Sequence, residues 1–271
     1  MGPMVRTISA IAVLLIGHGT LIAEDAIPCR LRVLCYNIHH GAGVDRKLDL
    51  PRIARVITSL KPDIVSLQEV DQRVSRTNQV DQPAELARLT KMKVVFGDNI
   101  EFGGGKYGEF GGGKYGNAIL SNHPIVKHRN HRLPNFDDGE QRGVLEATIR
   151  PAYWTEPIVF LATHLDHRPK DRERFESAKV INRIIEKRAG LSILAGDLND
   201  TIDSRTLVEL KKRWSPANKK PLPTVPVKKP SRQIDFILIR PPNRLKVVEV
   251  RVLSEAVASD HRAIFAVFEI H

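Results

Sequence analysis

The length, composition and charge of the chain are those of a folded, basic protein. Its 271 residues are 42% hydrophobic and 27% charged, which supplies enough apolar material for one large core and excludes an intrinsically disordered chain. A formal net charge of +11 attracts phosphorylated substrates, nucleic acid or acidic membranes. Because basic charge also serves solubility alone, it supports a phosphate substrate only weakly.

The N-terminal segment has the layout of a secretory signal peptide. Arg6 is the only charged residue before position 24, an apolar run follows at 8–16, and the small residue Ala23 precedes two acidic residues. The apolar run is shorter than the about 20 residues that a membrane-spanning helix needs. We therefore expect residues 1–23 to be a signal peptide, residues 24–271 to form one catalytic domain, and the protein to be exported, periplasmic or extracellular, without stable membrane insertion.

The chain has two cysteines, and the sequence argues against a disulfide between them. Cys35 lies inside the apolar run 31–36, where a small buried side chain is the ordinary interpretation. If Cys29 lies on the same extended strand, the two residues are too far apart to bridge. We expect both cysteines to be free.

Short runs rich in Val, Ile and Leu recur along the chain and predict β-strands. These runs are residues 31–36, 64–68, 94–97, 118–120, 144–149, 158–163, 192–195, 234–239, 247–253 and 264–270. Helical periodicity is found at 50–60, 82–90, 171–188 and, more weakly, 204–214. So many strands with so few helices indicate two packed sheets with helices on their outer faces.

Two irregular segments interrupt this pattern. Residues 102–108 recur identically at 110–116, and a small tandem duplication that lengthens a Gly-rich loop is the simplest account. The second segment, 211–232, is rich in Lys, Arg and Pro. Its composition predicts a stiff basic excursion, which is either a solvated loop or a rim that faces substrate.

Polar residues with catalytic or metal-binding potential occur where the predicted strands begin or end. Taken singly, each has an ordinary explanation as a turn former, a surface carboxylate or a structural histidine. Strand ends converge when sheets pack, so together these side chains can line one cleft. They are Asn37, Glu69, Asn117, His164, Asp197, Asn199, Asp235, Asp260 and His261.

Seven motifs built on these residues occur in the order found in the endonuclease/exonuclease/phosphatase superfamily. They are Tyr36-Asn37-Ile38, Leu67-Gln68-Glu69-Val70, Tyr115-Gly116-Asn117-Ala118-Ile119-Leu120-Ser121, Thr163-His164-Leu165, Gly196-Asp197-Leu198-Asn199, Ile234-Asp235-Phe236-Ile237 and Ser259-Asp260-His261. Each motif is weak alone, but seven in order over residues 31–270 form a specific resemblance. It implies a four-layer α/β/β/α sandwich of two packed mixed sheets, with the active site at one edge.

The resemblance also implies a divalent metal site. Glu69 is similar to the family's principal Mg²⁺ ligand, with Asn37 nearby and Asp260 as a further ligand, direct or through water. Hard oxygen donors suit Mg²⁺, with Mn²⁺ as an alternative, and the Cys/His cluster that a zinc site prefers is lacking. His39 and His40 lie beside Asn37, but as a lone pair they do not make a metal site.

Catalytic roles follow from the same resemblance. Asp197 matches the carboxylate that orients or deprotonates the attacking water, and Asn199 helps to hold water or phosphate. Asp235 and His261 resemble the family's carboxylate–imidazole pair. The carboxylate fixes the ring tautomer and raises the pKa of the imidazole, so that the cation can donate to a phosphate oxygen.

Other residues are candidates for contacts with the phosphate. The resemblance implies that His164 donates a second hydrogen bond to it and that Asn117 helps to position it. Arginine matches phosphate geometry, which makes Arg73, Arg76 and Arg168 candidates for substrate binding. Arg142 reaches the cleft only if the strand that follows it borders the cleft, and we assign it no role.

These residues predict a Mg²⁺-dependent phosphoric ester hydrolase in which water attacks phosphorus in line. We favour a phosphodiesterase or nuclease-like activity, with nucleic acid as one candidate partner. A phospholipid or inositol-phosphate phosphoesterase is the alternative, because this fold hosts many substrates. A catalytically retired polyanion-binding module is the non-enzyme alternative, and the retained acids and histidines argue against it. We expect a monomer.

Overall fold

The structure is a computed structural model that describes residues 1–2, 29–103, 111–152 and 154–271. The expected signal peptide, apart from its first two residues, and residues 104–110 of the duplicated segment lie outside the described residues.

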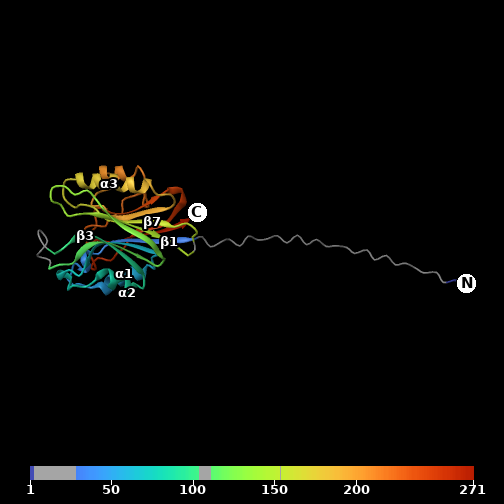
Figure 1. Cartoon of the computed structure of the whole chain (residues 1–271), viewed down its shortest axis with the longest axis horizontal. Helices are drawn as coiled ribbons and strands as arrows, with labels where there is room; N and C mark the ends of the chain where they lie inside the picture. Colours follow the sequence, from blue (N-terminus) through green and yellow to red (C-terminus); the bar gives the residue numbers. More distant parts are fainter. Residues whose placement is uncertain (3–28, 104–110, 153) are drawn as a thin grey trace.

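Two mixed sheets stack face to face (Figure 1). In the described residues, one sheet has the order β11 (Leu245–Val252), β12 (Ile264–Ile270), β1 (Arg30–Asn37), β2 (Ile64–Gln72), β4 (Lys114–Ser121) and β3 (Lys93–Glu101). The other has the order β5 (Ile125–Arg132), β6 (Gly143–Ile149), β7 (Ile158–His164), β8 (Ser192–Asp197), β10 (Asp235–Arg240) and β9 (Ser215–Pro216).

Helices cover the outer face of each sheet, which confirms the expected α/β sandwich (Figure 1). The helices α1 (Leu50–Ser59) and α2 (Gln82–Thr90) lie on the first sheet, and α3 (Arg172–Glu186) and α4 (Arg205–Leu210) on the second. Short 3₁₀ turns are η1 (His39–Gly41), η2 (Ser75–Thr77) and η4 (Pro242–Arg244). No helix in the described part of the chain is long and apolar enough to span a membrane.

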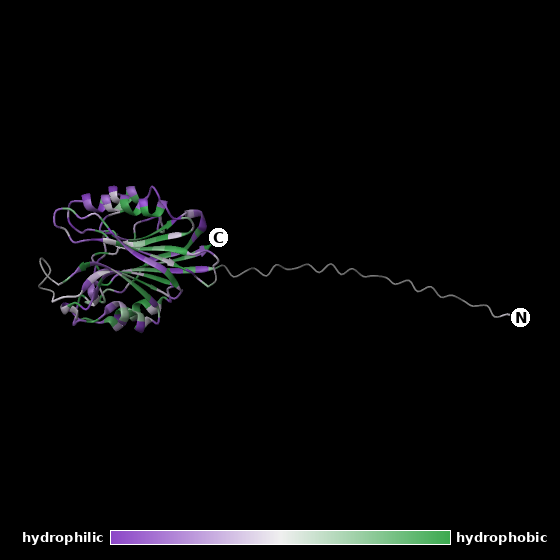
Figure 2. Cartoon of the chain, in the orientation of Figure 1, coloured by the Kyte–Doolittle hydropathy of each residue, from purple (hydrophilic) through white to green (hydrophobic). Residues whose placement is uncertain are grey.

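The strands are apolar on both faces because each sheet is buried on both sides. In β7, Phe160 and Ala162 face the core between the sheets, whereas Val159 and Leu161 face the core under α3. Figure 2 shows the consequence as hydrophobic strands inside the sandwich and hydrophilic surfaces on the helices. This alternation with period two holds the strand ends in a fixed register.

All ten predicted strands are present, and the differences from prediction lie at the periphery. The sequence did not predict β5, because this edge strand is largely exposed and its polar side chains lack an apolar face, nor the two-residue strand β9. Charged residues on an edge strand discourage pairing with other chains. The helix predicted at 204–214 ends at Leu210. Cys29 directly precedes β1, and Cys35 is buried inside it.

Candidate active site

The strand ends bring the predicted site residues to one shared edge of the two sheets. Asn37, His164 and Asp197 are the last residues of β1, β7 and β8, and Asp235 is the first residue of β10. In the second sheet Asp197 is the register partner of both His164 and Asp235. Parallel strands end on the same side, and antiparallel neighbours begin there, so the topology itself causes this convergence.

A β-bulge turns Glu69 toward this edge. The register between β2 and β4 shifts between Leu67 and Val70, and Glu69 has a positive φ of 56°. Bulges redirect side chains next to active sites, and a left-handed conformation is unfavourable for a residue other than glycine. The β-bulge therefore places the Glu69 carboxylate at this edge.

Asn37 connects the two sheets at the site. Its Nδ2 donates to Glu69 Oε1 at 3.0 Å and to Asp197 Oδ2 at 3.1 Å. Burial opposes ionisation of Glu69, but the nearby imidazole of His40 and the amide of Asn37 outweigh it. They hold the pKa of Glu69 well below its usual range, so its carboxylate is ionised at neutral pH.

Asp235 and His261 form a buried carboxylate–imidazole pair. His261 Nδ1 donates to Asp235 Oδ2 at 2.9 Å, and its Nε2 lies 3.7 Å from Asp197 Oδ2. Burial lowers the pKa of His261, but the charge and hydrogen bond of Asp235 outweigh it and raise the pKa to about 10. Burial, with the charge of Asp235, raises the pKa of Asp197 to about 7. An imidazolium therefore lies beside a carboxyl group that titrates near neutrality.

Arg142 fixes the tautomer of His164. Its Nη1 lies 3.1 Å from His164 Nδ1 and its Nη2 lies 3.1 Å from His167 Nδ1. A guanidinium can only donate, so both Nδ1 atoms accept and each neutral ring carries its proton on Nε2. Burial and the charge of Arg142 keep the pKa of His164 well below its usual range. His164 therefore presents an N–H at the site, with Nε2 3.5 Å from Asp197 Oδ2.

These groups line a pocket of about 430 Å³. One part of its wall carries the predicted residues Glu69, His164, Asp197, Asn199, Asp260 and His261. The rest is formed by His39, His40, Arg76, Ile100, Phe102, Tyr115, Glu140, Arg142 and His167. Asn37 and Asp235 lie behind the wall and reach it through their hydrogen bonds to Glu69, Asp197 and His261.

The structure separates the three candidate arginines. Arg76 lines the pocket, but both ends of its guanidinium bind the buried Asp71 at 2.8 Å. Arg73 does not line this pocket, because it extends into solvent with its Nε 3.8 Å from Asp81. Arg168 does not line it either.

Arg168 instead binds the loop that contains Phe136 and Asp137. Its Nε lies 3.0 Å from Asp166 Oδ1, and its terminal nitrogens donate to the carbonyls of Phe136 and Asp137 at 3.1 Å and bind Glu173. None of residues 211–232, all of which are described, lines the pocket, although the carbonyls of Thr224 and Val227 accept hydrogen bonds from Arg262, the neighbour of His261.

Asn117 and Asn199 support the site in different ways. Asn117 Nδ2 donates to the carbonyl of Gly143 at 3.2 Å, and its buried Oδ1 has no hydrogen-bond partner. The Asn199 backbone N–H donates to Asp197 Oδ1 at 2.9 Å, with a positive φ of 50° at Asn199. Asn199 thus orients the carboxylate through its backbone.

Sequence reasoning assigned no site role to Arg142, His39 or His40. Arg142 directly precedes β6, and the two histidines follow β1 after one intervening residue, Ile38. Their positions beside strand ends were the available signal, but the partners that give them a role are distant in sequence.

The donor set fits a divalent cation. Glu69 is ionised, and its Oε2 faces His40 Nδ1 at 3.9 Å, which is too long for a hydrogen bond. Asp260 lines the same pocket but lies outside both groups of clustered His, Asp and Glu side chains in the described residues. Mg²⁺ readily retains water, so Asp260 can serve as a ligand through a water molecule.

A model of the Endonuclease/Exonuclease/phosphatase family matches residues 34–261. The chain belongs to this family. Its members are hydrolases that act on phosphate esters and generally depend on divalent metals. A search of curated proteins found no match.

Solved structures show the same fold. An endonuclease/exonuclease/phosphatase from Beutenbergia cavernae is 25% identical, with a TM-score of 0.77 over 89% of this chain and 72% of that chain. A mannosyl-6-phosphatase from Bacteroides thetaiotaomicron is 17% identical, with a TM-score of 0.70 over 88% and 99%. TDP2 from Caenorhabditis elegans is 21% identical, with a TM-score of 0.65 over 89% and 74%.

Proposed function

We propose that the protein is an exported, Mg²⁺-dependent phosphoesterase that hydrolyses phosphate esters by in-line attack of water. The observation that carries this proposal is the meeting of Glu69, Asp197 and His261 at one pocket. An ionised carboxylate, a carboxyl group that titrates near pH 7 and an imidazolium supply a cation ligand, a proton acceptor and a phosphate donor.

Asp197 is the group that accepts the proton of the attacking water. Its pKa of about 7 lets it take up a proton near neutral pH. The backbone N–H of Asn199 holds Oδ1, and Asn37 holds Oδ2. Both oxygens are thus fixed by residues from different sheets, which orients the carboxylate before substrate arrives.

His164 and His261 are the donors to the phosphate. Their Nε2 atoms lie 3.5 and 3.7 Å from the same oxygen of Asp197, so both converge on the place where the reacting group is bound. Arg142 holds the first ring and Asp235 the second. Donors fixed in advance stabilise the negative charge that develops in the transition state.

Glu69, Asn37 and Asp260 are the residues that would hold Mg²⁺. When bound, the cation supplies Lewis-acid stabilisation of phosphoryl and leaving-group oxygens. Asn37 Nδ2 donates to both Glu69 and Asp197, and its Oδ1 accepts from the backbone N–H of His39, so Asn37 also orients the ligand carboxylate.

The pocket favours a phosphate ester in which the phosphate lies at the end of the substrate molecule or in a flexible, unpaired nucleic-acid strand. A duplex nucleic acid would require basic contacts along its backbone, yet none of residues 211–232 lines the pocket and Arg76 is neutralised by Asp71. Phosphodiesters with one small or unpaired end are the favoured class. The mannosyl-6-phosphatase neighbour makes sugar phosphomonoesters the second candidate.

Export belongs to the same proposal and rests on the sequence of residues 1–23. N-terminal sequencing of the protein recovered outside the cytoplasm is expected to begin after Ala23 or within a few residues of it. Recovery of the intact N-terminus from the cytoplasm alone would contradict export without affecting the proposed chemistry.

Hydrolysis of bis-p-nitrophenyl phosphate and p-nitrophenyl phosphate with Mg²⁺ tests the activity. We expect hydrolysis that EDTA abolishes, and a loss of about 10²–10⁴-fold in kcat for Asp197→Asn. Glu69→Gln and His261→Ala are expected to be severely impaired while remaining folded. Asp203→Asn, which alters an exposed carboxylate, is the matched control. Full activity in EDTA, or in Asp197→Asn, would refute the proposal.

A further inference from the structure

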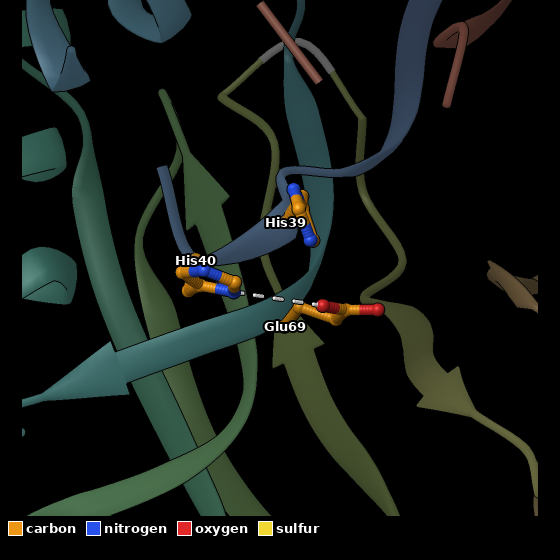
Figure 3. Close-up of side chains that lie close together, drawn as sticks. All are labelled: His39, His40 and Glu69. Atoms are coloured by element: carbon orange, nitrogen blue, oxygen red, sulfur yellow. Dashed lines mark ion pairs between the residues drawn. The ribbon is translucent and has the colours of Figure 1, made fainter. Parts of the chain in front are cut away.

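The two oxygens of Glu69 face different surroundings. Oε1 accepts from Asn37 at 3.0 Å, whereas Oε2 faces the imidazole of His40. Figure 3 shows His39 and His40, from the turn after β1, gathered with Glu69, from the bulge of β2. Each of the three offers one potential ligand atom, and these atoms lie within 4.8 Å of one another.

His39 is held with a free lone pair on Nε2. Its Nδ1 lies 3.0 Å from the carbonyl of Ala42, and because a carbonyl can only accept, Nδ1 carries the proton. A neutral ring with this tautomer has an unprotonated Nε2. This arrangement, with the distal nitrogen bound to a backbone carbonyl, is typical of histidines that ligate metals.

His40 has an unsatisfied nitrogen in the same cluster. Its Nδ1 is buried without a hydrogen-bond partner and lies 3.9 Å from Glu69 Oε2. That distance is too long for a hydrogen bond. Two ligand atoms that are each about 2.1 Å from one cation lie about 3 to 4 Å apart, depending on the angle between them. The separation of 3.9 Å, which is that of an ion pair when His40 is protonated, therefore also fits two ligands of one cation.

We propose that His39, His40 and Glu69 form a second cation site, which takes a first-row transition ion of the Zn²⁺ class. Imidazole nitrogens select such ions over Mg²⁺, whereas the oxygen donors on the other side of Glu69 suit Mg²⁺. Glu69 would then contribute one oxygen to each of two unlike sites. This inference rests on the proposed function only in sharing Glu69. It differs from the expectation, drawn from the sequence alone, that His39 and His40 do not make a metal site.

Equilibrium dialysis of the full chain against Zn²⁺, with Mg²⁺ in large excess, tests the site. We expect one Zn²⁺ per chain in the wild type and an affinity weaker by about 10-fold or more in the His39→Gln/His40→Gln double variant. His128→Gln, on the exposed strand β5, is the matched control and is expected to bind like the wild type. X-ray absorption at the zinc edge is expected to show two imidazole ligands in the wild type.

Three results would overturn the inference. The first is that the wild type does not bind Zn²⁺. The second is that the affinity of the double variant stays within about twofold of the wild type. The third is that His261→Gln loses Zn²⁺ binding while the double variant keeps it. The last result would put Zn²⁺ in the buried Asp197, Asp235 and His261 cluster. Circular dichroism shows whether each variant is folded. Hydrolysis with Mg²⁺ alone is measured separately, so failure of this site and failure of the proposed function are distinguishable.

Discussion

At the scale of single residues, the site depends on which nitrogen of each histidine carries a proton. Arg142 settles this for His164, and Asp235 settles it for His261. The two rings are held in opposite protonation states. The cation Arg142 keeps His164 neutral, and the anion Asp235 keeps His261 charged. Each arrangement points an N–H at the oxygen of Asp197.

Arg142→Gln is expected to lower kcat by up to about 100-fold, because His164 loses the donor that fixes its tautomer. KM is expected to change little, since Arg142 acts through His164. Nitrogen NMR of His164 should show the Nε2–H form in the wild type and a mixture in the variant. His167→Gln removes the other partner of Arg142 and is the comparison. An unchanged kcat together with a mixed tautomer would contradict the positioning role.

Asp235→Asn is expected to shift the alkaline limb of the pH profile of kcat/KM to lower pH. His261 is a cation below its pKa of about 10, so activity persists in alkaline solution and falls as pH rises through that value. Without the charge of Asp235 the imidazolium loses its proton at lower pH. If the alkaline limb is unchanged in the variant, His261 is not the group that titrates there.

At the scale of elements, the sequence predicted regular structure well and irregular structure poorly. Continuous apolar runs identified β1, β6 and β7, because most of each strand is buried on both faces. β5 escaped because its side chains are solvated. The bulge at Glu69 is invisible in composition, since it is set by pairing with β4, a strand more than 40 residues away.

The start of α1 gives an element-scale prediction. The Asp49 side chain accepts from the backbone N–H of Arg52 at 2.8 Å and caps the helix. Asp49→Ala is expected to cost about 1 kcal/mol of unfolding free energy, or about 2–4 °C in Tm. Asp49→Asn keeps the cap and should stay close to the wild type. Equal losses in both variants by thermal denaturation would show that charge, and not capping, is responsible.

At the scale of the whole molecule, the site forms because the two sheets pack face to face with their functional strand ends at the same edge. The hydrogen bonds from Asn37 to Asp197 and from Ser66 Oγ to the carbonyl of Ala195, at 2.9 Å, cross between them. Family motifs in the sequence predicted that Asn37, Glu69, Asp197 and His261 would meet. They did not predict the opposite wall of the pocket, whose residues come from loops and from the β3–β4 pair.

Phe160→Ala tests the role of the inter-sheet core. Phe160 is fully buried between the sheets, and its truncation is expected to cost about 3–5 kcal/mol in unfolding free energy. Chemical denaturation measures this loss. Val126→Ala, on the exposed edge strand, should change little by comparison. A small loss at Phe160 would mean that the sheets are not held together by this core.

The most direct test of the central claim is a crystal structure of the protein with Mn²⁺ and inorganic phosphate, read by anomalous scattering. We predict a Mn²⁺ peak about 2 Å from a Glu69 oxygen, with phosphate oxygens in hydrogen-bond contact with His164 and His261. Metal and phosphate bound together away from Glu69, Asp197 and His261 would contradict the assignment of this edge as the catalytic site.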